Sequence, residues 1–139
     1  MAILSFISMY ALMYSMVNNF ENVFMNVNQF YMAALMASPM MIIEVLLMRT
    51  MYQNKKLNLI LLGSSAVALI GFFFAIRAQA GVSDRQFLKS MIPHHSGAIL
   101  MCEQADITDP ELRKLCDDII ANQQKEIAVM KARLEELEK

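Results

Sequence analysis

The chain has 139 residues, 57% of them hydrophobic, and its formal net charge is −1. This length allows one domain, or a membrane anchor with a small helical module, and the hydrophobic content is too high for an ordinary soluble domain. The charge balance and the lack of a basic patch argue against nucleic acid as a partner.

The charged residues are distributed unevenly along the chain. Residues 1–80 hold four of the twelve Lys and Arg residues and two of the thirteen Asp and Glu residues, whereas residues 82–139 hold the other eight and eleven. This change in composition predicts two parts. Residues 1–81 form a transmembrane anchor, and residues 82–139 form a helical domain outside the membrane.

The first part contains three apolar runs, and we interpret each as a transmembrane helix. The runs cover about residues 2–17, 30–48 and 57–76. The second and third approach the roughly 20 residues needed to cross the hydrocarbon core, and the first is slightly short. The first run lacks the positively charged start and the small-residue cleavage site of a signal peptide.

The loop between the second and third runs contains Arg49, Lys55 and Lys56. Positively charged loops are retained on the cytoplasmic side, so we expect this loop inside and the segment near Glu21 outside. Three spans then leave the N-terminus in the cytoplasm and residues 82–139 in the periplasm or outside the cell. The location that we expect is a bacterial inner (plasma) membrane.

Two features of the apolar runs allow a functional interpretation. Glu44 lies within the second run, where a carboxylate either marks a function or extends to the interface and pairs with a polar group. Methionines recur at helical spacing in the first two runs, and they are either soft ligands along a copper path or flexible apolar packing. These methionines are Met9, Met13, Met16, Met32, Met36 and Met40.

The second part predicts two helices, at about residues 84–105 and 110–138. Ser83 and Gln86 have the spacing of a capping box at the start of the first helix. Asp109 followed by Pro110 is typical of the start of a helix. Because the turn between the helices is short, we expect an antiparallel hairpin.

Residues at helical spacing predict which face of each helix meets the other. Both stripes are apolar except near their middle. The stripe on the first helix is Phe87, Met91, His94, Ala98, Met101 and Ala105. The stripe on the second helix is Leu112, Cys116, Ile119, Gln123, Glu126, Met130, Leu134 and Leu137.

Folding the hairpin about residue 108 places Met91, His94, Gln123 and Glu126 at one level, with His95 beside them. A buried imidazole or carboxylate without a partner is costly. Either His94 and Glu126 form a hydrogen bond that fixes the helix register, or imidazole and thioether groups bind a metal ion. Neighbouring residues on a helix point about 100° apart, so one hairpin is not expected to direct both histidines at one ion.

The residues 91–95 (MIPHH), with Ala98, Met101 and the later Gln123, Glu126 and Met130, resemble the family described as domain of unknown function three-hundred-and-five. The resemblance covers about residues 84–134. It implies a ferritin-like helical fold and, because some members bind copper outside the cytoplasm through His and Met, a copper ion as ligand. The metal ligands that it implies are Met91, His94, His95, Met101 and Met130, with Glu126 as a ligand or an orienting group and Gln123 in support.

Cys102 and Cys116 are additional to this family signature and are expected at one level across the hairpin. A disulfide, a packed pair of thiols and a pair of soft-metal ligands are the alternatives outside the cytoplasm. Two helices at the usual interaxial distance hold opposite Cα atoms too far apart for a disulfide. We therefore favour free thiols.

These patterns predict an all-α protein in which three transmembrane helices anchor an extracytoplasmic ferritin-like half-bundle in the lipid bilayer. The expected function is copper binding for tolerance, storage or delivery. The sequence shows no nucleophile–base arrangement, phosphate loop or paired-carboxylate di-iron pattern, so we do not expect an enzyme. One hairpin hardly closes a bundle alone, so we expect a homodimer or docking to another membrane subunit. The alternative function is a structural or accessory subunit of a larger membrane complex.

Overall fold

A computed structural model describes residues 1–48, 51 and 53–139. The regular elements in this part of the chain are all helical, as the sequence predicted. They form two units, one of Met1–Met13 with Val27–Gly81 and the other of Tyr14–Asn26 with Val82–Lys139. Arg49, on which the predicted orientation partly depends, lies outside the described residues.

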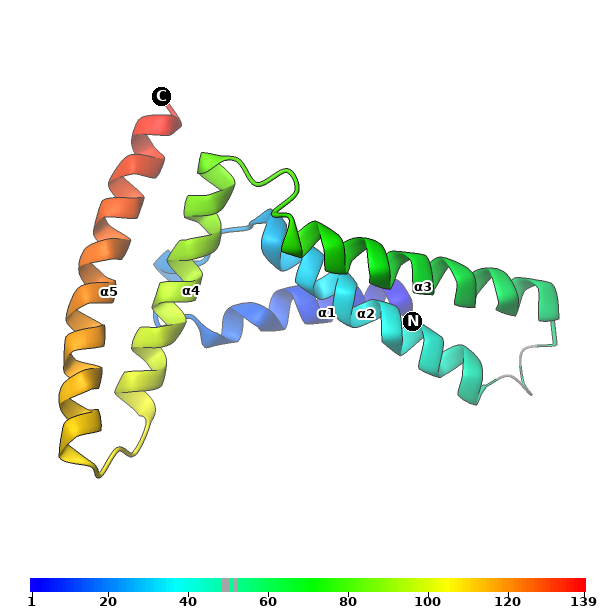
Figure 1. Cartoon of the computed structure of the whole chain (residues 1–139), viewed down its shortest axis with the longest axis horizontal. Coiled ribbons are helices and arrows are strands. Elements are labelled where there is room, and N and C mark those ends of the chain that lie inside the picture. Colours follow the sequence, from blue (N-terminus) through cyan, green and yellow to red (C-terminus); the bar gives the residue numbers. More distant parts are fainter. Residues whose placement is uncertain (49–50, 52) are drawn as a thin grey trace. The chain divides into compact units, whose positions relative to one another are not determined.

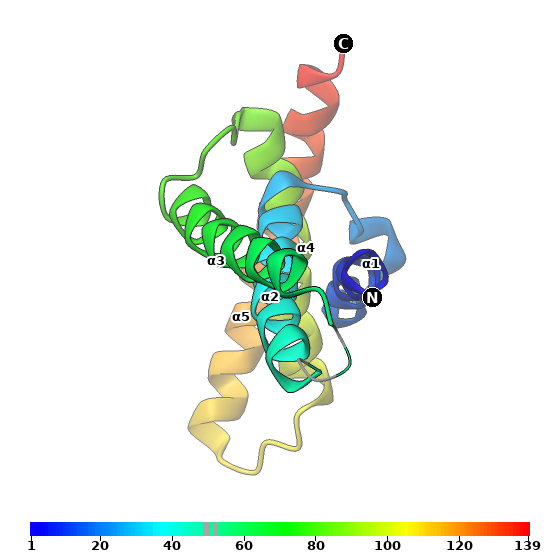
Figure 2. The ribbon, with the colours of Figure 1, turned by 90° about the vertical axis from the view of Figure 1, so that its right-hand side faces the viewer.

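The first unit contains α1 (Ala2–Leu12), α2 (Val27–Leu47) and α3 (Lys55–Arg77). α2 packs against both other helices and lies between them in Figure 2. Among the described residues, α2 and α3 are the helices long and apolar enough to cross a membrane by length and composition.

The prediction of three transmembrane helices is wrong for the first apolar run. α1 has 11 residues and ends at Leu12, and the chain continues as the 3-10 helix Met13–Met16. With rises of about 1.5 and 2.0 Å per residue, the two pieces together cover about 25 Å. This length is shorter than the hydrocarbon core of about 30 Å.

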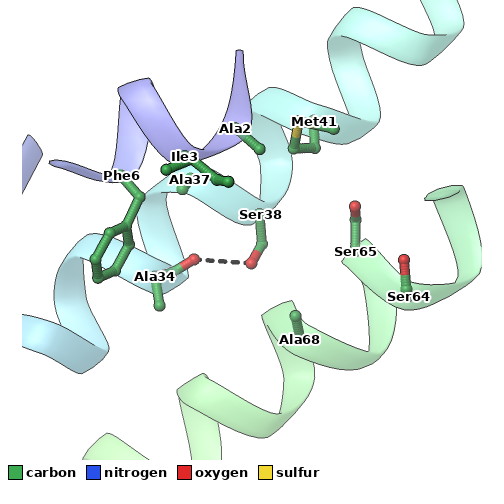
Figure 3. Close-up of a pocket in the computed structure, with 10 residues that line it drawn as sticks. All are labelled: Ala2, Ile3, Phe6, Ala34, Ala37, Ser38, Met41, Ser64, Ser65 and Ala68. Atoms are coloured by element: carbon green, nitrogen blue, oxygen red, sulfur yellow. Dashed lines mark hydrogen bonds between the residues drawn. The ribbon is translucent and has the colours of Figure 1, made fainter. Parts of the chain in front are cut away.

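A cavity of about 400 Å³ lies among the three helices of the first unit. Figure 3 shows the side chains that line it, among them Ser38, whose hydroxyl donates a hydrogen bond to the carbonyl oxygen of Ala34 at 2.8 Å. Met41 lines this cavity, whereas no methionine of the predicted α2 stripe does. Glu44 lines a neighbouring cavity together with Met1 and Met41.

The second unit contains α4 (Asp84–Gln104) and α5 (Pro110–Leu137), which lie side by side. The order of their cross-contacts shows that they run in opposite directions, as Figure 1 also shows. These contacts are the Cys102–Cys116 disulfide, the contact of His95 with Glu126, and the ion pair of Lys89 with Glu138.

Side chains at helix ends set the limits of both elements. Asp109 caps α5 by accepting hydrogen bonds from the N–H groups of Glu111 and Leu112 at 2.8 and 3.0 Å. Ser83 is the N-cap of α4, but its side chain forms no capping hydrogen bond. The expected cap position is therefore right, but the side-chain hydrogen bond that Ser83 would make in a capping box is absent.

The ion pair at the far end of α5 joins Glu138 to two cations of α4. The Glu138 carboxylate lies 3.0 Å from both Lys89 Nζ and an Arg85 guanidinium nitrogen. Hydrogen bonds from Lys89 and Arg85 lower the pKa of Glu138 below its ordinary value. This cluster connects the last turn of α5 to the first two turns of α4.

The core of the second unit is formed by Ile92, Ile99, Ile127 and Leu134, which are at most 7% exposed. On α4 the buried residues follow the predicted contact stripe by one position. Three residues of the predicted stripe are exposed: Phe87 (50%), Met101 (61%) and His94. A shift of one residue rotates the contact face by about 100°. On α5, Cys116 and Leu134 are buried as predicted, but Ile127 is buried in place of Glu126.

The segment Tyr14–Asn26, which the sequence assigned to the membrane part, packs on α4 as a strap. The hydroxyl of the fully buried Ser96 accepts a hydrogen bond from the Asn18 N–H at 2.9 Å and contacts the Asn22 side-chain amide at 3.4 Å. It also donates to the side-chain oxygen of Asn18. Phe24 of the strap packs against the core of the unit.

Replacing Ser96 by Ala should therefore destabilise the second unit. The substitution removes a buried hydroxyl and leaves the backbone N–H of Asn18 without its partner, which costs about 1–3 kcal/mol. Hydrogen exchange of α4 peptides in the full chain measures the loss. Ser83→Ala is the matched control, because the Ser83 side chain makes no capping bond, and it should change stability by less than about 0.5 kcal/mol.

Candidate metal centre

The candidate site is a cavity of about 420 Å³ between α4 and α5. Met91 and His95 line it from successive turns of α4, and Glu126 and Met130 line it from successive turns of α5. Residues four apart on a helix lie on one face, so each helix presents its pair together. The remaining lining residues are Phe87, Asn122, Lys125 and Val129.

The other residues of the predicted ligand set lie elsewhere. His94 is exposed and absent from the cavity lining, and its ring centroid is 6.1 Å from that of His95. Met101 is 61% exposed near the end of α4. Gln123 is partly buried, and its side-chain oxygen has no hydrogen-bond partner. Only His95 of the two histidines lines the cavity, in keeping with their different directions on the helix.

The prediction that Cys102 and Cys116 are free thiols is wrong, because they form a disulfide. Their Cα atoms are 5.2 Å apart, within the usual range for a disulfide. The prediction used the separation of two helices along their length. At Cys102 and Cys116, which lie near the turn between the two helices, the Cα atoms are closer than this separation.

The two ring nitrogens of His95 have different partners. Nδ1 lies 2.9 Å from the carbonyl oxygen of Met91, which can only accept, so Nδ1 carries the hydrogen. Nε2 lies 2.8 Å from Oε2 of Glu126. In a neutral imidazole, Nε2 would then direct a lone pair at a carboxylate oxygen. This contact is satisfied by a second ring proton or by a cation that both atoms share.

The cavity combines soft neutral donors with a small net charge. The thioethers of Met91 and Met130 and the imidazole of His95 are neutral ligands, and the carboxylate of Glu126 is offset by the ammonium group of Lys125. This donor set suits a soft monovalent cation better than a hard divalent one. Cu(I) is an ion with these preferences.

The part of the chain that the structure describes contains no cluster of three or more His, Cys, Asp or Glu side chains able to hold a metal ion. The thioether groups of Met91 and Met130 are further possible ligands in the cavity. Lys125, which also lines the cavity, was not among the residues expected at this site.

These features define a helical protein with a His/Met cavity between two helices. The family described as "Domain of unknown function (DUF305)" matches residues 74–134. The chain belongs to this family, as the residues around His94 and His95 indicated, and the match contains every residue that lines the cavity.

A relative matches the chain over nearly its whole length. The chain is 36% identical over 139 residues to the uncharacterized protein L153 of Acanthamoeba polyphaga mimivirus, and the match covers 98% of this chain and 90% of that protein. No solved structure matches the chain. The ferritin-like assignment of the fold accordingly stays a prediction.

Proposed function

We propose that this protein binds copper as Cu(I) in the cavity between α4 and α5 and serves copper tolerance, storage or delivery without catalysis. The observation that carries the proposal is the orientation of His95. Its Nδ1 is held by the Met91 carbonyl oxygen at 2.9 Å, while Nε2 faces Glu126 in a cavity that Met91 and Met130 also line.

The chemistry of the side chains supports this assignment. A backbone carbonyl that holds one ring nitrogen is the usual support for a histidine that binds metal through the other. His95 Nε2 and the sulfurs of Met91 and Met130 would hold the ion. Glu126 would balance its charge or orient His95, and Lys125 would disfavour a divalent ion.

Copper titration of the full chain in mild detergent, with its disulfide intact, tests the proposal. We expect one Cu(I) per chain in competition with a chromophoric chelator. His95→Ala should weaken binding by more than about 100-fold, and Glu126→Gln by about 10–100-fold, as expected for an orienting group.

Matched control variants exist within the same chain. His94→Ala and Met101→Leu change residues of the same types that do not line the cavity, so both should bind Cu(I) like the natural protein. Undiminished binding by His95→Ala, or an equal loss in His94→Ala, would contradict the ligand assignment.

We also propose that α2 and α3 span a membrane and that the second unit lies on its non-cytoplasmic side. Two spans return the chain to the side from which it left, which suits the packing of the strap with α4 and α5 in one unit. Lys55 and Lys56 start α3 at the opposite end and favour the cytoplasm there. The disulfide favours an oxidising compartment for the second unit. The N-terminus was expected in the cytoplasm because three spans were expected. With two spans, this proposal does not place the N-terminus there.

Labelling of single added cysteines tests this orientation. Asn19, Gln53 and Ser83 are all exposed, and the natural cysteines are bonded to each other. A membrane-impermeant maleimide added outside should label Asn19→Cys and Ser83→Cys but not Gln53→Cys until the membrane is opened. The reverse labelling pattern would overturn the orientation.

The alternative function is a structural or accessory subunit of a larger membrane complex. Direct contact of His95 with Glu126 at 2.8 Å favours it, because this contact can set the helix register without metal. Leu112 and Leu115 are 54% and 53% exposed on α5 and offer an apolar surface to another subunit or to a second copy. Native mass in mild detergent, together with the metal content, separates a metal-free assembly with another polypeptide from a copper-loaded monomer or homodimer.

A further inference from the structure

The disulfide Cys102–Cys116 is a pair of soft donors that the copper cavity does not use. It joins the last turns of α4 to the first turns of α5, and neither cysteine lines the cavity of His95. Along α4, Cys102 is about two turns, or roughly 10 Å, from His95. The pair is therefore separate from the proposed copper cavity.

We propose that the reduced Cys102–Cys116 pair is a second site for Cu(I), and that the disulfide is the closed form of this site. Thiolate sulfur is the softest donor available in the chain and is preferred by Cu(I). Because the Cα atoms are 5.2 Å apart, both sulfurs can reach one ion by side-chain rotation, without movement of the helices.

The surroundings of the pair suit a soft ion. Cys102 and Cys116 are 7% and 8% exposed, so a bound ion would be largely shielded from water. Ile99, one turn before Cys102, belongs to the apolar core of the unit, and Ile120, one turn after Cys116, packs against that core. These two aliphatic side chains offer no oxygen ligand, and the carboxylates next in sequence, Glu103 and Asp117, are exposed.

Opening the site requires two electrons and two protons. A dithiol reductant supplies both by thiol–disulfide exchange: its two sulfurs become a disulfide while the protein disulfide becomes two thiols. Cu(I) then displaces the two thiol protons and is bound by both sulfurs. No electron passes between sulfur and copper in this step. The number of copper ions that the chain holds thus depends on the redox state of the cysteine pair.

Titration of the oxidised and the reduced full chain with Cu(I) tests this inference. Protein reduced by a dithiol and freed of it without oxygen should bind one more Cu(I) per chain than oxidised protein. The additional ion should produce an ultraviolet thiolate-to-copper absorption band. The variant Cys102→Ser/Cys116→Ser should lack this ion and the band under both conditions, and His95→Ala should keep both.

The outcomes distinguish this site from the copper cavity. If oxidised protein binds no copper while the reductant-dependent ion remains, the cavity proposal fails and the cysteine site stands. Equal binding by oxidised and reduced protein would overturn the cysteine site. It would also be overturned if Cys102→Ser alone kept the additional ion with unchanged affinity, because a pair would then not be needed.

Discussion

Replacing Ile99 by Ala is expected to destabilise the unit formed by the strap, α4 and α5 by about 2–5 kcal/mol. Ile99 is 1% exposed and packs in the core with Ile92 and Ile127, so truncation leaves a cavity that the surrounding helices only partly fill. Hydrogen exchange of α5 peptides in the full chain measures the effect. A loss of 2 kcal/mol corresponds to an opening equilibrium about 30-fold more favourable.

Met101→Ala is the matched control, and it also tests the orientation of α4. Met101 belongs to the contact stripe predicted from the sequence, but it is 61% exposed in the structure. Its truncation should change stability by less than about 0.5 kcal/mol. If Met101→Ala were the costly change and Ile99→Ala the mild one, α4 would be rotated from the position described.

The helical elements of the second unit were largely predictable because their ends have strong local signals. The expected start of the last helix at Pro110 agrees with the structure, where Asp109 caps α5 through two backbone N–H groups. The end of α1 was not predictable in the same way. An apolar run continues to Val17, and side-chain hydropathy does not indicate where an α-helix changes into a 3-10 helix.

The rotation of α4 could not be derived from its own sequence. One face carries Phe87, Met91 and Met101, and the adjacent face carries Ile92, Ile99 and Cys102, so apolar residues occur at helical spacing on both. Periodicity alone cannot choose between two such faces. The choice follows from long-range contacts, including the disulfide to α5 and the strap on Ser96.

The position of the candidate site along the two helices was predictable, but the set of residues that form it was not. Met91 and Glu126 were expected at that level and do line the cavity, and so does Met130, which the family resemblance implied as a ligand. His95 takes the position expected for His94, because α4 is rotated by one residue. The strap was missed altogether, although the polar run that contains Asn18 and Asn22 interrupts the apolar sequence just where a segment would leave the membrane.

Reduction of the Cys102–Cys116 disulfide is expected to lower the stability of the second unit by about 3 kcal/mol, the value that chain entropy predicts for a loop of about 15 residues. The two cysteines are separated by 14 positions, so the bond restricts a short stretch of the unfolded chain. The thermal unfolding temperature of the full chain, with and without a dithiol and without copper, measures the change. The variant Cys102→Ala/Cys116→Ala should be insensitive to the dithiol. If the natural protein unfolds at the same temperature under both conditions, the bond does not stabilise the second unit, and the apolar core with Ile92, Ile99 and Ile127 and the polar contacts between α4 and α5 hold these helices together.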